Sequence, residues 1–368
     1  MGMEELSMRK YILETPVQLR KNIQNSRNLT QCMVDLYLKH PVKSMRIVAC
    51  GSSYNAVLCA RYFMKKILNV DVKIIPPFTF NHYEHDISND DFVVCISQSG
   101  YSTNTIDSLR LCRKLGVFAL GLTGNTDSAF KQEADEVIDF GLGGEKLDFV
   151  TKGVVTLTAF LMLFSLHAAL RLGKLDEVKL TAIKNDMLLA VENYENILKQ
   201  FDAFFTSNRK ALLSMEKVYL IGAGANYGTV LEGAVKIGET VHVLAVGYET
   251  DEFIHGPQIQ LTPNYNLIFI DSGDETSSRI FQAYQAGSCI SDRVFILSNN
   301  PDIESKCVMR VPHHVPEELS PLYTLAFVQM LACTVAETNN TWKTHPLLEN
   351  FKEHLFGKTD GYEAYDCT

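Results

Sequence analysis

A strand that runs through a glycine- and serine-rich turn into a helix occurs twice in this chain, and this repeat restricts the fold more than any other feature. The first copy spans residues 46–68 through the turn CGSSYN, and the second spans residues 217–241 through GAGANYG. Strands that alternate with helices predict a parallel sheet covered on both faces. Two copies are too few for a solenoid. We therefore expect an α/β protein built from two doubly wound units.

Apolar segments between the turns indicate the remaining strands and helices. In the first half, strands are expected at Met45–Ala49, Val72–Ile75, Asp91–Ile96, Val117–Leu122 and Glu136–Phe140. The helices expected there are Ala56–Leu68, about Thr105–Lys114, and a long stretch over 152–213 that is interrupted near Gly173. In the second half, strands are expected at Lys217–Ile221, Leu267–Asp271, Val294–Leu297 and Val308–Val311, with helices at Thr229–Val241 and Leu322–Thr338.

The chain of 368 residues is longer than one compact core usually covers, which favours two domains. We expect an N-terminal helical segment over 1–43, which stops at Pro41, and a first sheet domain over 44–190. A second sheet domain is expected over 200–340, followed by a C-terminal tail over 341–368 near the active site. The boundary between the sheet domains should fall within about 175–210.

Composition and charge exclude several classes of protein. The chain has 34 Lys and Arg against 43 Asp and Glu, so its net charge of −9 argues against general nucleic-acid binding. A small phosphorylated ligand remains compatible, because backbone amides and hydroxyls can hold one phosphate. The N-terminus carries charges where a signal peptide needs an apolar stretch. The most apolar segment, Val154–Leu170, is short and interrupted by Thr and His, which favours a buried helix over a membrane span.

The nine cysteines include no CxxC pair and lie mostly in apolar runs, which predicts reduced, buried thiols in a cytoplasmic protein. They are Cys32, Cys50, Cys59, Cys95, Cys112, Cys289, Cys307, Cys333 and Cys367.

Two polar loops in the first half each follow a strand and open a helix. They are CGSSYN at 50–55 and SQSGYSTNT at 97–105. Ligands of an open parallel sheet bind at the carboxyl ends of its strands, where helix N-terminal amides favour an anion. Serine also caps helices, and a single loop of this kind would fit that role equally well. Because two such loops occur in one domain, we expect a phosphate site.

The turn GAGANYG at 222–228 differs from a dinucleotide fingerprint. Its GxGxxxG spacing is one residue too long, and we find no acidic residue at the end of a following strand about 20 residues on. Glycines of a tight strand-to-helix turn are the better interpretation, and no cofactor is expected.

A charged row on one predicted helix is the densest cluster in the chain. Glu232, Lys236 and Glu239 are spaced i, i+4 and i+7, so they share a helical face, and His255-Gly256-Pro257 follows. Such a row is usually a solvated face with ion pairs. A carboxylate and a histidine are also the pair that proton transfer on a sugar requires.

Other histidine groups do not have metal-site spacing. The segment His82-Tyr83-Glu84-His85 lacks the i, i+4 pair and a third ligand, and His313 and His314 are adjacent. No GxSxG nucleophile turn is present. We expect no metal.

Taken in order, these segments resemble a known family. The residues concerned are Cys50-Gly51-Ser52-Ser53, Ser97-Gln98-Ser99-Gly100-x-Ser102, Glu145 with Thr151-Lys152, EGAVKIGE and HGP. They are similar to the isomerase half of glucosamine-6-phosphate synthase, which consists of two sugar-isomerase (SIS) domains. The resemblance implies two SIS domains, each a doubly wound five-stranded parallel sheet flanked by helices.

The resemblance also implies roles for individual residues. The catalytic residues would be Glu239, which moves a proton between C1 and C2, His255, which assists ring opening from a neighbouring subunit, and Lys236 and Glu232 beside them. The substrate-binding residues would be Cys50, Gly51, Ser52, Ser53, Ser97, Gln98, Ser99 and Ser102. A homodimer or higher oligomer that shares His255 across subunits is therefore expected.

Departures from the synthase narrow the implied activity. The chain shows no glutaminase domain, and Val150 replaces a serine of the TK segment. The tail FGKTDGYEAYDCT does not reproduce the motif of the Schiff-base lysine, so Lys358 is nearby but out of place. In this respect the chain resembles fructoselysine- and glucoselysine-6-phosphate deglycases. That resemblance implies cofactor-independent release of a hexose 6-phosphate and an amine from a phosphorylated Amadori-type amino sugar.

Two alternatives remain at this point. One is a ketose/aldose-6-phosphate isomerase or an amino-sugar-6-phosphate deaminase/isomerase. The other is a non-catalytic phosphosugar sensor, a class that usually carries a DNA-binding domain or lacks the glutamate–histidine pair.

Overall fold

The computed structural model describes residues 7–39, 42–301, 303, 305–355 and 357–364, so the expected helix stop at Pro41 and the thiol of Cys367 lie outside it. The chain divides into two compact units. The first unit comprises Val17–Lys184 and His345–Asp366, and the second comprises Met1–Pro16, Asn185–Thr344 and Cys367–Thr368. The helices α1 (Met8–Gln24) and α8 (Glu177–Leu213) each contain a point of division.

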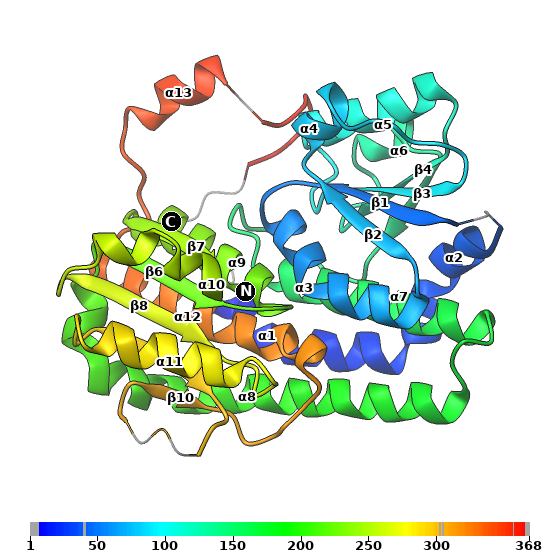
Figure 1. The fold of residues 1–368 in the computed structure, drawn as a ribbon. Coiled ribbons are helices and arrows are strands. Elements are labelled where there is room, and N and C mark those ends of the chain that lie inside the picture. Colours follow the sequence, from blue (N-terminus) through cyan, green and yellow to red (C-terminus); the bar gives the residue numbers. More distant parts are fainter. Residues whose placement is uncertain (1–6, 40–41, 302, 304, 356, 365–368) are drawn as a thin grey trace, which may run out of the picture. The chain divides into compact units, whose positions relative to one another are not determined.

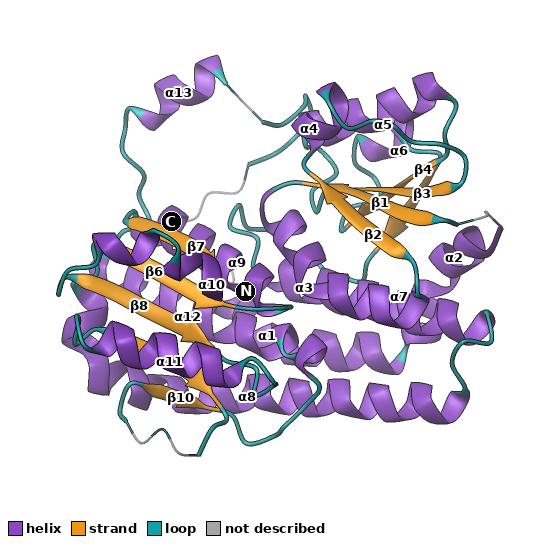
Figure 2. Cartoon of the chain, in the orientation of Figure 1, coloured by secondary structure: helices purple, strands orange, loops and turns teal. Residues whose placement is uncertain are grey.

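Within its described residues, the first unit folds around a five-stranded parallel sheet of order β2-β1-β3-β4-β5 (Figures 1 and 2). Its strands are β1 (Ser44–Ala49), β2 (Asp71–Ile75), β3 (Asp91–Ile96), β4 (Ala119–Thr123) and β5 (Glu136–Asp139). Its helices are α2 (Ser26–Lys39), α3 (Gly51–Leu68), α4 (Pro77–His82), α5 (Thr103–Leu115), α6 (Phe130–Glu133), α7 (Lys152–Arg171) and α13 (Leu348–His354). The expected strands of the first half are confirmed.

Helices cover both faces of this sheet, which explains its apolar strands. The residues of β3 after Asp91 are all buried. Helices α4, α5 and α6 lie on one face, and α3 and α7 lie on the other (Figure 2). By length and composition α7 is apolar enough to cross a membrane, but 94% of its most apolar window is buried. It is the buried helix that the sequence predicts over Val154–Leu170.

The order of the strands brings the two serine-rich loops together. Strands β1 and β3 are parallel neighbours, and Ala49 pairs with Ile96 at their carboxyl ends. The chain then leaves β1 for α3 on one face and β3 for α5 on the other. Such a switch point opens a crevice at the carboxyl ends of an α/β sheet, and ligands bind there in doubly wound folds.

The described parts of the second unit repeat this architecture, with a parallel sheet of order β10-β9-β8-β6-β7. Its strands are β6 (Lys217–Gly222), β7 (Leu244–Glu249), β8 (Tyr265–Ile270), β9 (Val294–Ser298) and β10 (Val308–Arg310). Its helices are α9 (Asn226–Val241), α10 (Thr250–Ile254), α11 (Ser277–Ser288) and α12 (Pro321–Asn339), with short 3-10 turns at Pro257–Gln260 and Glu317–Leu319. Two five-stranded α/β sheets confirm the predicted fold class.

Strand β7 does not appear among the strands expected from the sequence. It is an edge strand that is only partly buried, so it lacks the apolar run of β6 and β8. Gly247 interrupts its centre, and a Cβ atom there would lie 2.9 Å from the carbonyl oxygen of Val230 in α9. Close packing of β7 on α9 therefore requires the residue that weakens the strand signal.

The expected burial of the cysteines is wrong in part. Each cysteine in the described residues is a free thiol, but Cys32 and Cys289 are exposed and Cys50 and Cys307 are half-buried. Cys32 lies on the outward side of α2, where helical periodicity outweighs the apolar neighbours in the sequence.

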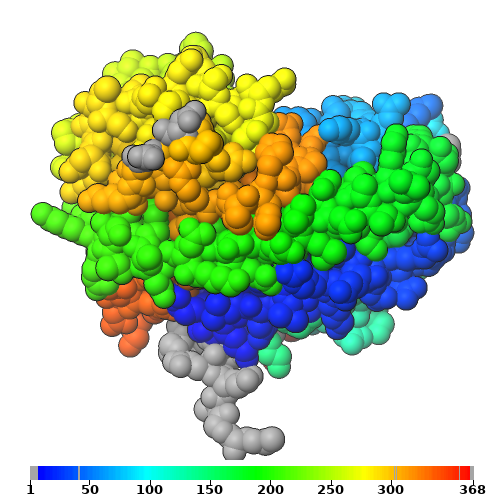
Figure 3. Space-filling view, turned by 90° about the horizontal axis from the view of Figure 1, so that it is seen from below, coloured from blue at the N-terminus to red at the C-terminus, as the bar shows by residue number. Residues whose placement is uncertain are grey.

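Helix α8 shows the same periodicity over a longer distance. Buried residues recur along one side of it, among them Met187, Val191, Tyr194, Ile197 and Phe201. Figure 3 shows its outer side as a green band.

Candidate functional site

The loop after β3 is held in a compact turn by its own serines. Ser97 Oγ lies 2.9 Å from Ser102 Oγ and accepts the backbone N–H of Gly100 at 3.1 Å. Gly100 has φ of +72°, and a Cβ atom there would lie 1.8 Å from Ser128 Oγ. A glycine is therefore required at this point, and the turn presents its hydroxyls at the start of α5.

A cavity of about 870 Å³ lies at the carboxyl ends of β1 and β3, wholly within the first unit. Its lining contains all eight residues predicted to bind substrate: Cys50, Gly51, Ser52, Ser53, Ser97, Gln98, Ser99 and Ser102. The helices α3 and α5 both begin at this cavity. Free N–H groups of helix N-termini and serine hydroxyls are suitable donors for a phosphate.

Glu145 fixes one wall of this cavity. Its Oε1 accepts the backbone N–H groups of Thr151 at 3.0 Å and Lys152 at 2.8 Å. Its Oε2 accepts the backbone N–H of Gly153 at 3.0 Å and the side-chain amide of Gln98 at 2.8 Å. Burial raises the pKa of Glu145, although these hydrogen bonds oppose the shift. The carboxylate thus caps α7 and orients Gln98.

The C-terminal segment returns to the same cavity, which corrects the expectation that Lys358 is out of place. Lys358 Nζ donates to Ser99 Oγ at 3.0 Å, and Lys358, Gly361 and Tyr362 line the cavity. Burial lowers the pKa of Lys358, with smaller opposing effects of Cys50 and Asp148. The short tail has no periodicity and meets its partner 259 residues away in sequence, so no local signal predicts this contact.

In the second unit, the charged row on α9 is buried rather than solvated. The side chains of Glu232 and Lys236 are 0% and 1% exposed, and Lys236 Nζ lies 3.2 Å from Glu232 Oε1. Lys236 also pairs with Glu239, whose side chain is 32% exposed. The cation therefore lies between two carboxylates, and only Glu239 reaches solvent.

The electrostatics of this row follow from burial and mutual attraction. Burial acts to lower the pKa of Lys236, but the carboxylates of Glu232 and Glu239 outweigh it, so that the pKa is raised. Burial raises the pKa of Glu239, and the attraction of Lys236 only partly offsets the effect. A carboxylate with a raised pKa and some access to solvent is suited to proton transfer.

His255 lies at the end of α10, directly before Gly256, which has φ of +142°. Its side chain is exposed. In the described parts of the chain, no hydrogen bond or ion pair joins His255 to Glu239. The structure thus brings the row on α9 together through ion pairs, and the described contacts do not include one between His255 and Glu239.

The expectation that no acidic residue ends the strand after GAGANYG is wrong. Strand β7 does end in an acidic residue, Glu249. Its Oε2 accepts the N–H groups of Asp251 at 2.8 Å and Glu252 at 3.2 Å, so this carboxylate caps α10. The spacing of the glycines in GAGANYG still differs from the dinucleotide fingerprint.

Among the residues that the structure describes, no group of three or more His, Cys, Asp or Glu has metal-site geometry.

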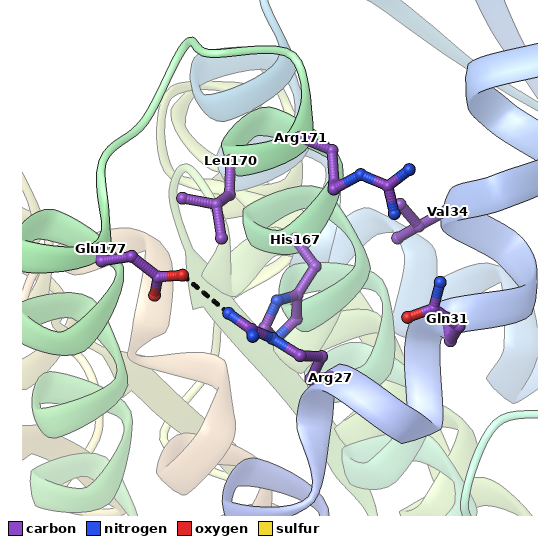
Figure 4. Close-up of a pocket in the computed structure, with 7 residues that line it drawn as sticks. All are labelled: Arg27, Gln31, Val34, His167, Leu170, Arg171 and Glu177. Carbon is purple, nitrogen blue, oxygen red and sulfur yellow. Dashed lines mark hydrogen bonds and ion pairs between the residues drawn. The ribbon is translucent and has the colours of Figure 1, made fainter.

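Another cavity of the first unit, of about 430 Å³, lies between α2, the end of α7 and the start of α8 (Figure 4). Arg27 pairs with Glu177 at 2.7 Å, and Arg171 pairs with Asp35 at 3.2 Å. Burial lowers the pKa of His167 in its wall to about 4. Because each guanidinium already faces a carboxylate, this cavity attracts an anion less than the serine-lined one.

Comparison with known proteins agrees with this architecture. The chain is 25% identical over 343 residues to the isomerizing glutamine–fructose-6-phosphate aminotransferase 1 of Rattus norvegicus, a match that covers 89% of this chain and 50% of that protein. The chain spans about half the length of the curated relatives that it matches.

Solved structures share the fold over nearly the whole chain. A Clostridium difficile 630 protein, provisionally assigned as a phosphosugar isomerase, superposes with a TM-score of 0.87 at 23% identity, and the match covers 96% of this chain and 99% of that one. The C-terminal domain of glucosamine-fructose-6-phosphate aminotransferase from Francisella tularensis superposes with a TM-score of 0.81 at 22% identity, with coverage of 92% and 97%.

The SIS domain family matches residues 40–166 and 211–288, which together make up more than half of the chain and contain the loops after β1 and β3 and the row on α9. With two parallel five-stranded sheets in the structure, this chain belongs to the SIS domain family and carries two such domains.

Proposed function

We propose that this protein is a cytoplasmic deglycase that acts on a phosphorylated Amadori-type amino sugar. The observation that carries the proposal is the buried row of Glu232, Lys236 and Glu239, which leaves one carboxylate with a raised pKa and access to solvent. Three buried charges cost desolvation free energy that apolar side chains of similar volume would avoid, so the row is an expensive arrangement for a purely structural role. Lys236 favours the deprotonated form of Glu239, and this is the form that a general base needs.

Substrate binding is assigned to the first unit. The cavity at the ends of β1 and β3 combines serine hydroxyls with the N-termini of α3 and α5, which supports a phosphate contact by Ser53, Ser97, Ser99 and Ser102. Cys50, Gly51, Ser52 and Gln98 would then lie beside the sugar. Its volume of about 870 Å³ is ample for a hexose phosphate with an attached amine.

The proposed reaction needs only proton transfers and water. Glu239 removes the proton from C1 of the amino ketose while O2 gains a proton, which gives an enaminol. Protonation at C2 then produces an imine between C1 and the amine nitrogen. Water adds to C1 and the C–N bond breaks, which releases a hexose 6-phosphate and a free amine or amino acid. No change of redox state occurs, so neither a nicotinamide nor a metal is required.

One observation favours a second candidate, an amino-sugar-6-phosphate deaminase/isomerase or a ketose/aldose-6-phosphate isomerase. The pKa of Lys358 is lowered by burial, and its amine lies in the serine-lined cavity. A lysine that is neutral more often than usual can condense with a ketose carbonyl. In the deglycase reaction the substrate supplies its own nitrogen, so this lysine would have no covalent role.

A substrate panel separates the candidates. Purified protein is incubated with several 6-phosphorylated Amadori compounds, fructose 6-phosphate and glucosamine 6-phosphate, and release of hexose 6-phosphate, amine and ammonia is followed. Amine release from Amadori compounds alone supports the deglycase. Ammonia release or ketose–aldose conversion supports the second candidate. If no member of the panel turns over or binds, the proposal is wrong.

We further propose a homodimer or higher oligomer in which His255 acts in the neighbouring subunit's site. The supporting observations are the exposed side chain of His255 and exposed apolar residues of the second unit, Leu244 at 60% and Ile259 at 83%. A stable interface of this kind buries more than about 1,000 Å². Light scattering that detects an active monomer would contradict it. Mixing His255→Ala with Glu239→Gln, two variants that are each expected to lose most of the activity, should restore part of it through hybrid oligomers.

A further inference from the structure

Residues 357–364, here called the C-terminal strap, run along the loop after β3. The backbone N–H of Thr103 donates to the carbonyl of Gly357 at 3.1 Å, and that of Thr359 donates to the carbonyl of Tyr101 at 2.9 Å. Between them Ser102 and Lys358 form an antiparallel bridge. The strap therefore pairs like a short strand with the loop that carries Ser99, and it satisfies an N–H group at the start of α5.

Tyr362 ties the far end of this strap to the cavity wall. Its hydroxyl donates to Asp148 Oδ1 at 2.7 Å. Its ring contacts the ring of Tyr101, with centroids 6.0 Å apart and planes at 59°. Gly361 just before it has φ of +86°, and a Cβ atom there would lie 3.6 Å from the Tyr101 ring. The chain thus turns sharply to bring Tyr362 back over the loop.

The same ring covers the amine of Lys358. Lys358 Nζ lies 4.9 Å from the centroid of Tyr362 and 3.0 Å from Ser99 Oγ, so it is held between an aromatic face and a hydroxyl. Fixing a lysine side chain costs about 2 kcal/mol of rotamer entropy. One hydrogen bond to a serine contributes less than this, so it does not hold the amine in place by itself. The aromatic face removes water and limits the directions in which the amine can point.

We propose that Tyr362, anchored by Asp148, is a positioning residue that aims the Lys358 amine at the carbonyl carbon of a bound sugar phosphate. This inference rests on the second candidate activity proposed above. The neutral amine adds to C2 of the ketose, the C2 oxygen takes up two protons in all and leaves as water, and a C=N bond joins Nζ to C2. No oxidant or reductant takes part.

Two probes separate binding from this step. Glucitol 6-phosphate has the phosphate and the carbon chain but no carbonyl, so calorimetry with it measures binding alone. Fructose 6-phosphate with borohydride reduces any imine to a stable adduct, and peptide mass spectrometry identifies the modified lysine. The variants are Tyr362→Leu, Tyr362→Phe and Asp148→Asn. The control is Tyr83→Leu, since Tyr83 is 74% exposed and outside the cavity lining.

We expect the wild-type adduct at Lys358 and a loss of trapping rate of about tenfold or more in Tyr362→Leu, because small misplacements of a reacting group cost this much. Tyr362→Phe should show an intermediate rate, because the ring stays but its anchor is lost. Asp148→Asn should lie closer to wild type, because the amide oxygen can still accept the Tyr362 hydroxyl. Affinity for glucitol 6-phosphate should change less than about threefold in all variants, and Tyr83→Leu should match wild type. A merely structural role for Tyr362 would weaken binding and trapping together.

Trapping by Tyr362→Leu at the wild-type rate overturns the inference. So does a wild-type protein that binds glucitol 6-phosphate but gives no adduct at Lys358, a result that leaves the deglycase proposal intact. If the wild-type protein neither binds glucitol 6-phosphate nor forms an adduct with fructose 6-phosphate, both this inference and the proposed phosphosugar function are wrong.

Discussion

The side-chain amide of Gln98 donates to Glu145 Oε2 across 2.8 Å, and this bond joins the loop after β3 to the segment that precedes α7. The same carboxylate accepts three backbone N–H groups at the start of that helix. Negative charge at a helix N-terminus is stabilised by the unpaired N–H groups and the helix dipole. Glu145 thereby couples the stability of α7 to the shape of the predicted binding loop.

We expect Glu145→Gln to lower both stability and apparent substrate affinity. The new amide turns N–H donors toward the donors of Gln98 and Gly153, so buried polar groups lose their partners. The free energy of unfolding should fall by about 1–3 kcal/mol in urea denaturation, and KM should rise. The control is Glu363→Gln, an exposed glutamate of the same cavity lining. Equal stability of Glu145→Gln and wild type would contradict the capping role.

Ser99→Ala and Ser53→Ala should each raise KM for a phosphorylated substrate by about tenfold or more. A hydrogen bond to a charged group contributes roughly 1.5–3 kcal/mol, and 1.4 kcal/mol corresponds to a factor of ten. Steady-state kinetics measure the effect, with Ser288→Ala on the exposed end of α11 as the control. If KM and kcat are unchanged in both variants, the phosphate binds elsewhere.

The sequence predicts the parts of the fold that depend on local pattern. The runs of β1 and β3 are apolar because helices cover both faces of the sheet, so their bounds follow from the sequence within a residue or so. Strand β7 is not predicted from the sequence, because it lies at the edge of its sheet and carries Gly247 where α9 packs closely. The position of β7 depends on its contact with α9, and the residues of β7 alone do not indicate this contact.

The candidate site divides in the same way. The loops at 50–55 and 97–105 are predictable because each is a strand-to-helix turn and the strand order of a doubly wound sheet places such turns together. The contacts of Lys358 and Tyr362 are not predictable, since they join a short irregular tail to loops more than 200 residues earlier. Helical spacing places Glu232 and Lys236 on one face, but only the structure distinguishes a buried row from a solvated one.

The raised pKa of Glu239 sets a direction for the pH dependence of activity. A general base acts only when it is deprotonated, so kcat/KM should fall as the pH is lowered. The midpoint of this acid limb should lie above the ordinary glutamate pKa of 4.5. Repulsion from Glu232 contributes to the raised pKa. Glu232→Gln removes that charge while Lys236 stays protonated, so the acid limb should move to lower pH. A limb that stays in place or moves upward in Glu232→Gln would show that another group controls it.

Glu239→Gln tests the proposed proton transfer most directly. The amide keeps the size of the side chain and can still accept a hydrogen bond from Lys236, but it cannot take up a proton from carbon. Because one positioned acid–base group contributes about 10²–10⁴ in rate, kcat should fall by at least that order. Binding of glucitol 6-phosphate should hardly change, since the predicted phosphate contacts lie in the other unit.

Exchange with solvent deuterium distinguishes a lost base from a damaged fold. Wild-type protein in D₂O should introduce deuterium at C1 or C2 of recovered substrate or product, whereas Glu239→Gln should introduce almost none. Glu232→Gln serves as the matched control, because it removes a carboxylate from the same row that is 0% exposed and out of reach of solvent. It should retain more exchange than Glu239→Gln. Normal exchange and turnover in Glu239→Gln would mean that another residue is the base, and the mechanism proposed for this site would then be wrong.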